Sequence, residues 1–129
     1  MAKIKGVHHI CLKANGLTQF EELVHFYKDI LELPVVYHWG EGEKQGMMLD
    51  TGDAYLELFP NAIDNPGQGA LRHLALATDD VDGCIEAVRA AGYEITIEPK
   101  DIDVGGVLPA RLAFCIGPMG EEVEFFCEK

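Results

Sequence analysis

Two histidines and two glutamates stand at matched places in this chain, and both residue types bind metal ions or move protons. His9 precedes Glu57 by 48 residues, and His73 precedes Glu124 by 51. Imidazole nitrogens together with carboxylate oxygens suit a divalent first-row metal such as Zn, Ni or Co, with room left for water or substrate. The spacing therefore predicts one metal site with the ligands His9, Glu57, His73 and Glu124.

Each of the four residues lies in an apolar segment that has the pattern of a β-strand. Alternate side chains of a strand lie on opposite faces, so apolar neighbours that enter the core place the histidine or glutamate on the other face. In the first segment, His9 shares its face with Cys11 and Lys13, opposite Ile10 and Leu12.

His8 is the alternative to His9 as a ligand. The alternation places His8 with Ile10 and Leu12, on the face that would pack under a helix, and the internal repeat aligns His8 with Arg72. Both arguments favour His9.

The four residues are carried by a unit that occurs twice, and a repeated chain is best interpreted as two copies of one supersecondary unit. Each copy has the order strand, helix and three strands, which predicts an α+β fold of two βαβββ modules. The expected modules are residues 5–60 and 70–129, joined by a polar linker at 61–69 within a single domain of 1–129. The expected helices are 17–31 and 81–91, and the expected strands are 5–14, 35–39, 47–51, 54–59, 70–77, 93–98, 111–116 and 121–127, with 99–110 as a mobile loop.

Composition excludes several classes of protein. The formal net charge of −12 disfavours a nucleic-acid partner, because a polyanion would be repelled. No apolar run approaches the length of a membrane span, and no leader segment opens the chain, so we expect a cytoplasmic protein without a membrane partner. The four cysteines form no CxxC pair and are expected to be reduced thiols.

Four motifs, taken together, resemble a known superfamily. They are the His-x-apolar-x strand at His9, the helix end FYKDILEL at 26–33, the strand YLELF at 55–59 and the closing GPMGEEVE at 117–124. This combination resembles the vicinal oxygen chelate superfamily, and most closely its glyoxalase I branch. The resemblance implies a curved mixed sheet that forms a cup around a metal, with helices on the convex face, commonly in a homodimer.

The order His, Glu, His, Glu is similar to glyoxalase I specifically, since other branches replace the second ligand or use three ligands. The resemblance implies a lyase that acts on the hemithioacetal of a thiol and a 2-oxoaldehyde through an enediolate. It also implies that Glu124 is the catalytic base, with Glu57 as its counterpart.

The resemblance extends partly to the residues that hold the thiol. Lys13 and Asn61 occupy positions where the family has substrate-binding residues, whereas Gly69 and Ile97 stand where it often has cations that grip glutathione. The identity of the thiol therefore stays open. Cys11 shares the face of His9, where it either lines the substrate pocket or acts as a small apolar filler.

Two other functions remain as alternatives. One is a different metal-dependent enzyme of the superfamily: an epimerase, an isomerase or a thiol transferase that detoxifies a small molecule. The other is a metal-free protein that binds a drug in the same cup, which the full set of two histidines and two glutamates disfavours.

Overall fold

The computed structural model of the chain describes residues 3, 5–64 and 68–129. The chain divides into two compact units, Met1–Asn65 and Pro66–Lys129. The division falls inside the predicted linker 61–69, of which residues 65–67 lie outside the described residues.

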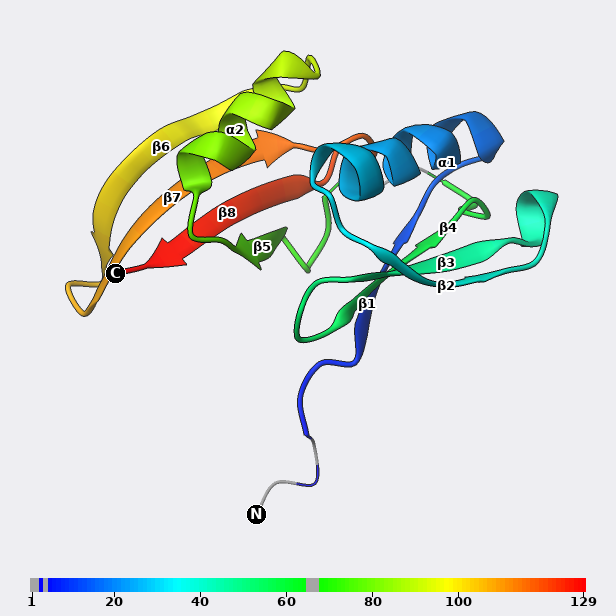
Figure 1. Cartoon of the computed structure of the whole chain (residues 1–129), viewed down its shortest axis with the longest axis horizontal. Helices are drawn as coiled ribbons and strands as arrows, with labels where there is room; N and C mark the ends of the chain where they lie inside the picture. The colour runs from blue at the N-terminus through cyan, green and yellow to red at the C-terminus, as the bar shows by residue number, and fades with distance from the viewer. Residues whose placement is uncertain (1–2, 4, 65–67) are drawn as a thin grey trace. The chain divides into compact units, whose positions relative to one another are not determined.

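The first unit is a four-stranded mixed sheet with one long helical segment and a short 3-10 helix (Figure 1). The strand order is β1-β4-β3-β2, with β1 parallel to β4 and the other neighbours antiparallel. The elements are β1 His9–Lys13, α1 Leu17–Val24, η1 His25–Ile30, β2 Val35–Trp39, η2 Gly42–Lys44, β3 Gly46–Asp50 and β4 Tyr55–Phe59.

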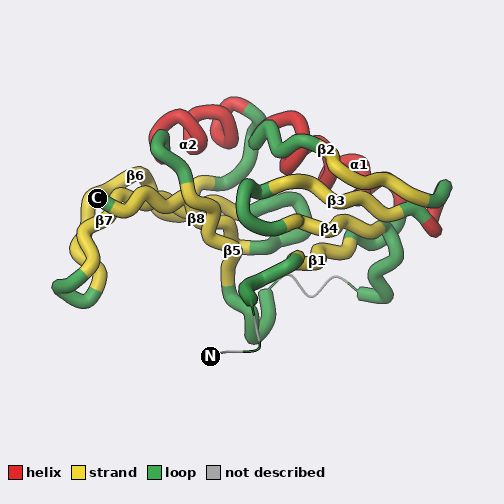
Figure 2. Tube along the Cα trace, turned by 60° about the horizontal axis from the view of Figure 1, so that its bottom comes forward, coloured by secondary structure: helices red, strands yellow, loops and turns green. Residues whose placement is uncertain are grey.

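Burial alternates strictly along β4 and shows which face of this sheet is covered. Leu56 and Leu58 are buried, whereas Tyr55, Glu57 and Phe59 are only partly buried. α1 packs against β4, and its buried residues supply the other side of the core. Figure 2 shows the four strands side by side with the helix on one side of them. Glu57 therefore lies on the face that the helix leaves uncovered.

The predicted helix 17–31 changes type half-way. It is α-helical as far as Val24 and continues as a π-helix over His25–Ile30, where the Leu31 amide donates to the Phe26 carbonyl. Glu32 then adopts a left-handed conformation with φ of 60°, two residues before Pro34. A left-handed residue followed by proline is a common way to end a helix.

The second unit repeats the plan with the order β5-β8-β7-β6 and a parallel β5–β8 pair. Its helix α2 is capped by the Asp80 carboxylate, which accepts a hydrogen bond from the Gly83 amide at 2.9 Å. Val81, Ile85 and Val88 of this helix are buried. The elements are β5 His73–Ala77, α2 Val81–Ala90, β6 Ile95–Val104, β7 Leu108–Ile116 and β8 Glu122–Glu128.

The prediction of a loop at 99–110 was wrong, because β6 and β7 extend through it as a hairpin with a turn around Gly105 and Gly106. Pro99 lies where the pairing register shifts, which is where a strand tolerates a residue without an amide proton. Arg111 stabilises the hairpin by binding Asp82 of α2 and Asp101 of β6.

The α+β prediction with two βαβββ modules is confirmed: each unit is a four-stranded mixed sheet with its helix on one face. The described helices include none that is both long enough and apolar enough to cross a bilayer.

Candidate metal centre

The first unit brings two of the predicted ligands together. His9 opens β1 and Glu57 lies in the middle of β4, the parallel neighbour of β1. His9 pairs in register with Tyr55, which lies two residues before Glu57 on the same face. The His9 Nε2 atom lies 3.5 Å from Glu57 Oε1.

The second unit brings the other two together in the same way. His73 opens β5 and pairs with Glu122 of β8, two residues before Glu124. The His73 Nε2 atom lies 3.1 Å from Glu124 Oε1. The ring of Phe114, on the neighbouring strand β7, meets the His73 ring edge to face at 5.3 Å. The two pairs thus have the same register and use the same ring nitrogen.

The distances fit two ligands of one metal ion. Donor atoms that each lie about 2.0–2.2 Å from a metal stand about 3.0–3.5 Å apart when they are adjacent ligands. Nitrogen from imidazole and oxygen from carboxylate are also suitable donors for the divalent metals expected from the sequence. Within the described part of the chain, no group of three or more His, Cys, Asp or Glu side chains is placed to hold a metal. Each histidine–glutamate pair is called a candidate half-site, or half-site for short.

The carboxylate of the second half-site is buried. Glu124 is 7% exposed, and this burial raises the pKa of its carboxyl group above the usual value. The neighbouring Glu122 carboxylate also raises that pKa, whereas the contact with His73 lowers it. A carboxylate with a raised pKa is a stronger proton acceptor.

Of the predicted substrate-binding residues, Cys11 and Lys13 lie on the face of His9, whereas Asn61 lies beyond the end of β4. Cys11 pairs in register with Glu57, and burial followed by the Glu57 charge raises the pKa of its thiol. Lys13 lies on the same face, with its Nζ atom 5.7 Å from the centre of the Phe59 ring. Asn61 is exposed beyond β4 and forms a backbone bridge with Asn15. Among the described contacts, none joins Asn61 to the His9–Glu57 pair.

The sequence argument about His8 was wrong. Strand alternation placed His8 with Ile10 and Leu12, on the face expected to pack under a helix. The ladder does reach His8, whose carbonyl accepts a hydrogen bond from the Tyr55 amide at 2.9 Å, but this face of β1 is not buried: Ile10 is 36% exposed and Leu12 is only partly buried. His8 is exposed, its ring centre lies 5.5 Å from that of Tyr55, and its Nδ1 atom lies 2.9 Å from His9 Nδ1. His8 is therefore a neighbour of the candidate ligand rather than a core residue.

Glu122 is a residue near the candidate site that the sequence argument did not identify. Its carboxylate lies 3.9 Å from the Nδ1 atom of His73. The signal was available, because Glu122 precedes Glu124 by two residues in a strand and so shares its face.

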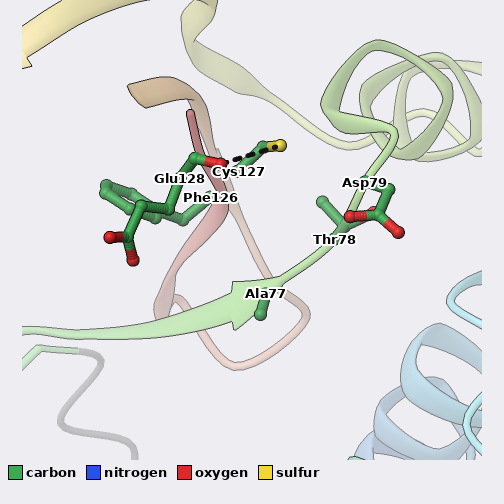
Figure 3. A pocket seen from close by; sticks show the side chains of 6 residues that line it. All are labelled: Ala77, Thr78, Asp79, Phe126, Cys127 and Glu128. Atoms are coloured by element: carbon green, nitrogen blue, oxygen red, sulfur yellow. Dashed lines mark hydrogen bonds between the residues drawn. The ribbon is translucent and has the colours of Figure 1, made fainter. Parts of the chain in front are cut away.

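A separate cavity of about 320 Å³ lies in the second unit. Figure 3 shows its lining of Ala77, Thr78, Asp79, Phe126, Cys127 and Glu128. These residues gather at the end of β5 opposite to His73. The cavity is therefore not the His73–Glu124 half-site.

Comparisons with known proteins agree with this architecture. The chain is 28% identical over 134 residues to the uncharacterized protein YaeR of Escherichia coli strain K12, with 98% of each chain covered. A glyoxalase/dioxygenase structure from Nostoc punctiforme has a TM-score of 0.75 at 20% identity, covering 98% of this chain and 93% of that one.

Two further solved structures with the same fold come from different branches. A glyoxalase I mutant from Zea mays has a TM-score of 0.73 at 21% identity, covering 92% of this chain and 43% of that one. The fosfomycin resistance protein FosX from Listeria monocytogenes, complexed with Mn(II) and sulfate, has a TM-score of 0.72 at 17% identity, covering 98% and 94%.

The family model for the Glyoxalase/Bleomycin resistance protein/Dioxygenase superfamily matches residues 6–125, which is nearly the whole chain. Together with the repeated βαβββ units, this match identifies the family. The chain belongs to the Glyoxalase/Bleomycin resistance protein/Dioxygenase superfamily, also known as the vicinal oxygen chelate superfamily.

Proposed function

We propose that the protein is a divalent-metal-dependent lyase of the glyoxalase I type, acting on a thiol hemithioacetal of a 2-oxoaldehyde. One observation carries the proposal: each unit sets one histidine nitrogen and one glutamate oxygen 3.5 or 3.1 Å apart on the sheet face that its helix leaves uncovered. Metal-free binding would give no reason for this pairing to occur twice.

The proposed metal ligands are His9, Glu57, His73 and Glu124, and the proposed ion is Zn, Ni or Co. The four ligands come together either within one chain or across a homodimer. When bound, the metal supplies Lewis acidity, which polarises the substrate's carbonyl group and makes the adjacent C–H bond more acidic. The chain's own residues then have to accept and return the proton.

Glu124 is the proposed base. It is the more deeply buried of the two carboxylates, and burial raises its pKa, so it accepts a proton more readily than an exposed glutamate. Glu124 takes the proton from C1 of the substrate and returns it to the adjacent carbon. Glu57 is its counterpart in the first unit.

Three residues are proposed to contact the rest of the substrate. Lys13 provides a cation on the face of His9, which suits an anionic group on the thiol. Cys11 lies between that lysine and His9 along the strand, and Asn61 follows the end of β4. We further propose that the enzyme is cytoplasmic and that it has no nucleic-acid or membrane partner.

A second candidate is another metal-dependent enzyme of the superfamily, such as an epimerase, isomerase or thiol transferase. Gly69 and Ile97 favour it, because neither can supply the positive charge that glutathione carboxylates would need at those positions. The metal chemistry is the same in both candidates, and they differ in the substrate.

Metal analysis of the purified protein, followed by assays with methylglyoxal hemithioacetals, tests the proposal. The thiols to compare are glutathione, bacillithiol and a truncated thiol without carboxylates. We expect about one divalent metal per site and turnover of at least one hemithioacetal. Bound metal without turnover of any of them would favour the second candidate, and a protein that binds no divalent metal would overturn both.

A further inference from the structure

The second half-site contains a carboxylate that the proposed function leaves unused. Glu122 begins β8 directly opposite His73, and its Oε1 atom lies 3.9 Å from His73 Nδ1. The other ring nitrogen, Nε2, faces Glu124 at 3.1 Å. The His73 ring therefore lies between two carboxylates of one strand, one toward each nitrogen.

A histidine that binds a metal uses one ring nitrogen and nearly always donates the N–H of the other to a carboxylate, a carbonyl or water. Such a partner holds the proton on the outer nitrogen, orients the ring and makes the inner nitrogen a better ligand. In His73 the inner nitrogen is Nε2, because it faces the proposed ligand Glu124. The outer nitrogen is Nδ1, and the carboxylate next to it belongs to Glu122.

We propose that Glu122 is a positioning residue for His73: it accepts the Nδ1–H bond and so presents Nε2 to the metal. This inference rests on the proposed function, since it concerns a ligand of that metal. Glu122 and His73 are paired in register and their side chains share a face, which places the carboxylate beside Nδ1 at 3.9 Å. The proposed hydrogen bond requires the oxygen to approach Nδ1 more closely than this.

The first half-site provides the contrast. The residue opposite His9 in the matching register is Tyr55, which carries no carboxylate. The outer nitrogen of His9 is instead contacted by His8, at 2.9 Å between the two Nδ1 atoms. Both histidines thus have a partner on the outer nitrogen, but only the partner of His73 carries a full negative charge.

The test compares Glu122→Gln and Glu122→Ala with the control Glu128→Gln. Gln keeps an acceptor oxygen without the charge, and Ala removes both. Glu128 lies on the same strand and face, six residues or about 20 Å from Glu122. The control therefore makes the same change in net charge away from His73. Zn²⁺ affinity is measured by competition with a chelator, and the His73 Nδ1–H proton is followed by NMR in the Zn²⁺-loaded protein.

We expect Zn²⁺ affinity to fall about 10–100-fold in Glu122→Ala and less in Glu122→Gln, with no change in Glu128→Gln. The Nδ1–H signal should move in Glu122→Gln and exchange rapidly with water in Glu122→Ala. Circular dichroism and the melting temperature should match those of the wild type, because Glu122 is partly exposed.

Three results would overturn the role. Unchanged Zn²⁺ affinity in Glu122→Ala would mean that the carboxylate does not support His73. A much larger loss of affinity with the Nδ1–H signal unchanged would make Glu122 itself a ligand. If both Glu122 variants lost affinity only in proportion to a loss of folded protein, the residue would be structural. In all three results the wild type still binds Zn²⁺, whereas failure of the proposed function would appear as a wild type that binds none.

Discussion

The two half-sites have the same geometry and different surroundings. In each, the histidine opens an edge strand, the glutamate lies two residues past its register partner, and Nε2 faces the carboxylate. The side chain of Glu57 is 13% exposed beside a histidine that is 41% exposed, and that of Glu124 is 9% exposed beside one that is 39% exposed. The repeat has thus kept the positions of the candidate ligands.

The neighbours of the two glutamates differ in kind. Glu57 lies between Cys11 on β1 and Met48 on β3, with Lys13 further along the same face. In the second unit Glu124 lies between Ala75 and Phe114.

This difference is consistent with different roles for the two glutamates. A thiol next to one glutamate, with an ammonium group further along the same face, is suited to contact a polar substrate. A methyl group and an aromatic ring next to the other exclude water, which favours a carboxylate that accepts protons. We therefore propose that the second unit provides the base and that the first unit contacts the substrate.

The sharpest way to break this comparison is to neutralise each glutamate in turn. We expect Glu124→Gln to lower kcat about 10²–10⁴-fold, because an amide cannot act as a general base. Glu57→Gln keeps a coordinating oxygen and should lower kcat less. Steady-state assays on the native substrate measure both effects.

Metal content is the control for these variants, since a variant that has lost its metal says nothing about the base. Equal losses of kcat in two metal-loaded variants would show that the two carboxylates share the proton transfer. A metal-loaded Glu124→Gln with wild-type turnover would show that Glu124 is not the base.

Removal of each histidine compares the units as metal ligands. His9→Ala and His73→Ala should both weaken metal binding, by more than the roughly 10–100-fold that the loss of an outer partner costs. Both side chains are substantially exposed, so the folds should survive. Metal analysis and circular dichroism check the two expectations. Full metal content in one variant only would assign the site to the other unit.

The sequence predicted the bounds of the strands and the faces of their side chains where the period of two continues without interruption. Leu56 and Leu58 flank Glu57 and are buried as the alternation requires, and the predicted strand 35–39 matches β2 at both ends. The same alternation puts Glu122 on the face of Glu124, so its place near His73 follows from the sequence pattern as well.

Where the prediction failed, the local pattern did not determine the pairing. Pro99 and the Gly105–Gly106 pair are typical of loops. Pairing with β7 nevertheless makes this segment part of a strand, in which Pro99 lies at a register shift. The prediction for His8 failed because alternation gives the face on which a side chain lies but not whether that face is covered, and Ile10 on the same face is exposed as well. Helical spacing also cannot separate the α-helix from the π-helix that follows it, since the buried stripe of Phe20, Leu23 and Phe26 runs through both.

A smaller effect is expected from His8. Because the ring is exposed and contacts His9 through Nδ1, His8→Ala should weaken metal binding by less than about 10-fold. The loss should be smaller than in Glu122→Ala, since water can replace an imidazole more easily than a carboxylate. Competition titrations of the two variants decide the order. A larger loss of metal affinity in His8→Ala than in Glu122→Ala would mean that His9 depends on its neighbour more than His73 does.

The smallest effect concerns Cys11, which has Ala75 as its counterpart and so marks the first half-site alone. Cys11 is exposed, whereas Cys115 is buried, which raises the pKa of the Cys115 thiol to about 12. A thiol reagent should therefore modify Cys11 first and Cys115 last, as followed by mass spectrometry of the metal-free protein. Metal together with a substrate analogue should protect Cys11 if the thiol lines the pocket.

The labelling rate also reports on the neighbour of Cys11. Although Cys11 is exposed as a residue, its sulfur is partly desolvated; this partial desolvation and then the Glu57 charge raise the pKa of the thiol, so the reactive thiolate is scarce at neutral pH. Glu57→Gln removes the charge, which lowers that pKa toward its usual value, and Cys11 should react a few-fold faster. Cys127 belongs to the other unit and serves as the internal control, with an unchanged rate. An unchanged labelling rate of Cys11 would mean that Glu57 does not affect this thiol. Cys11 could then no longer be counted as the polar neighbour that distinguishes the first half-site from the second.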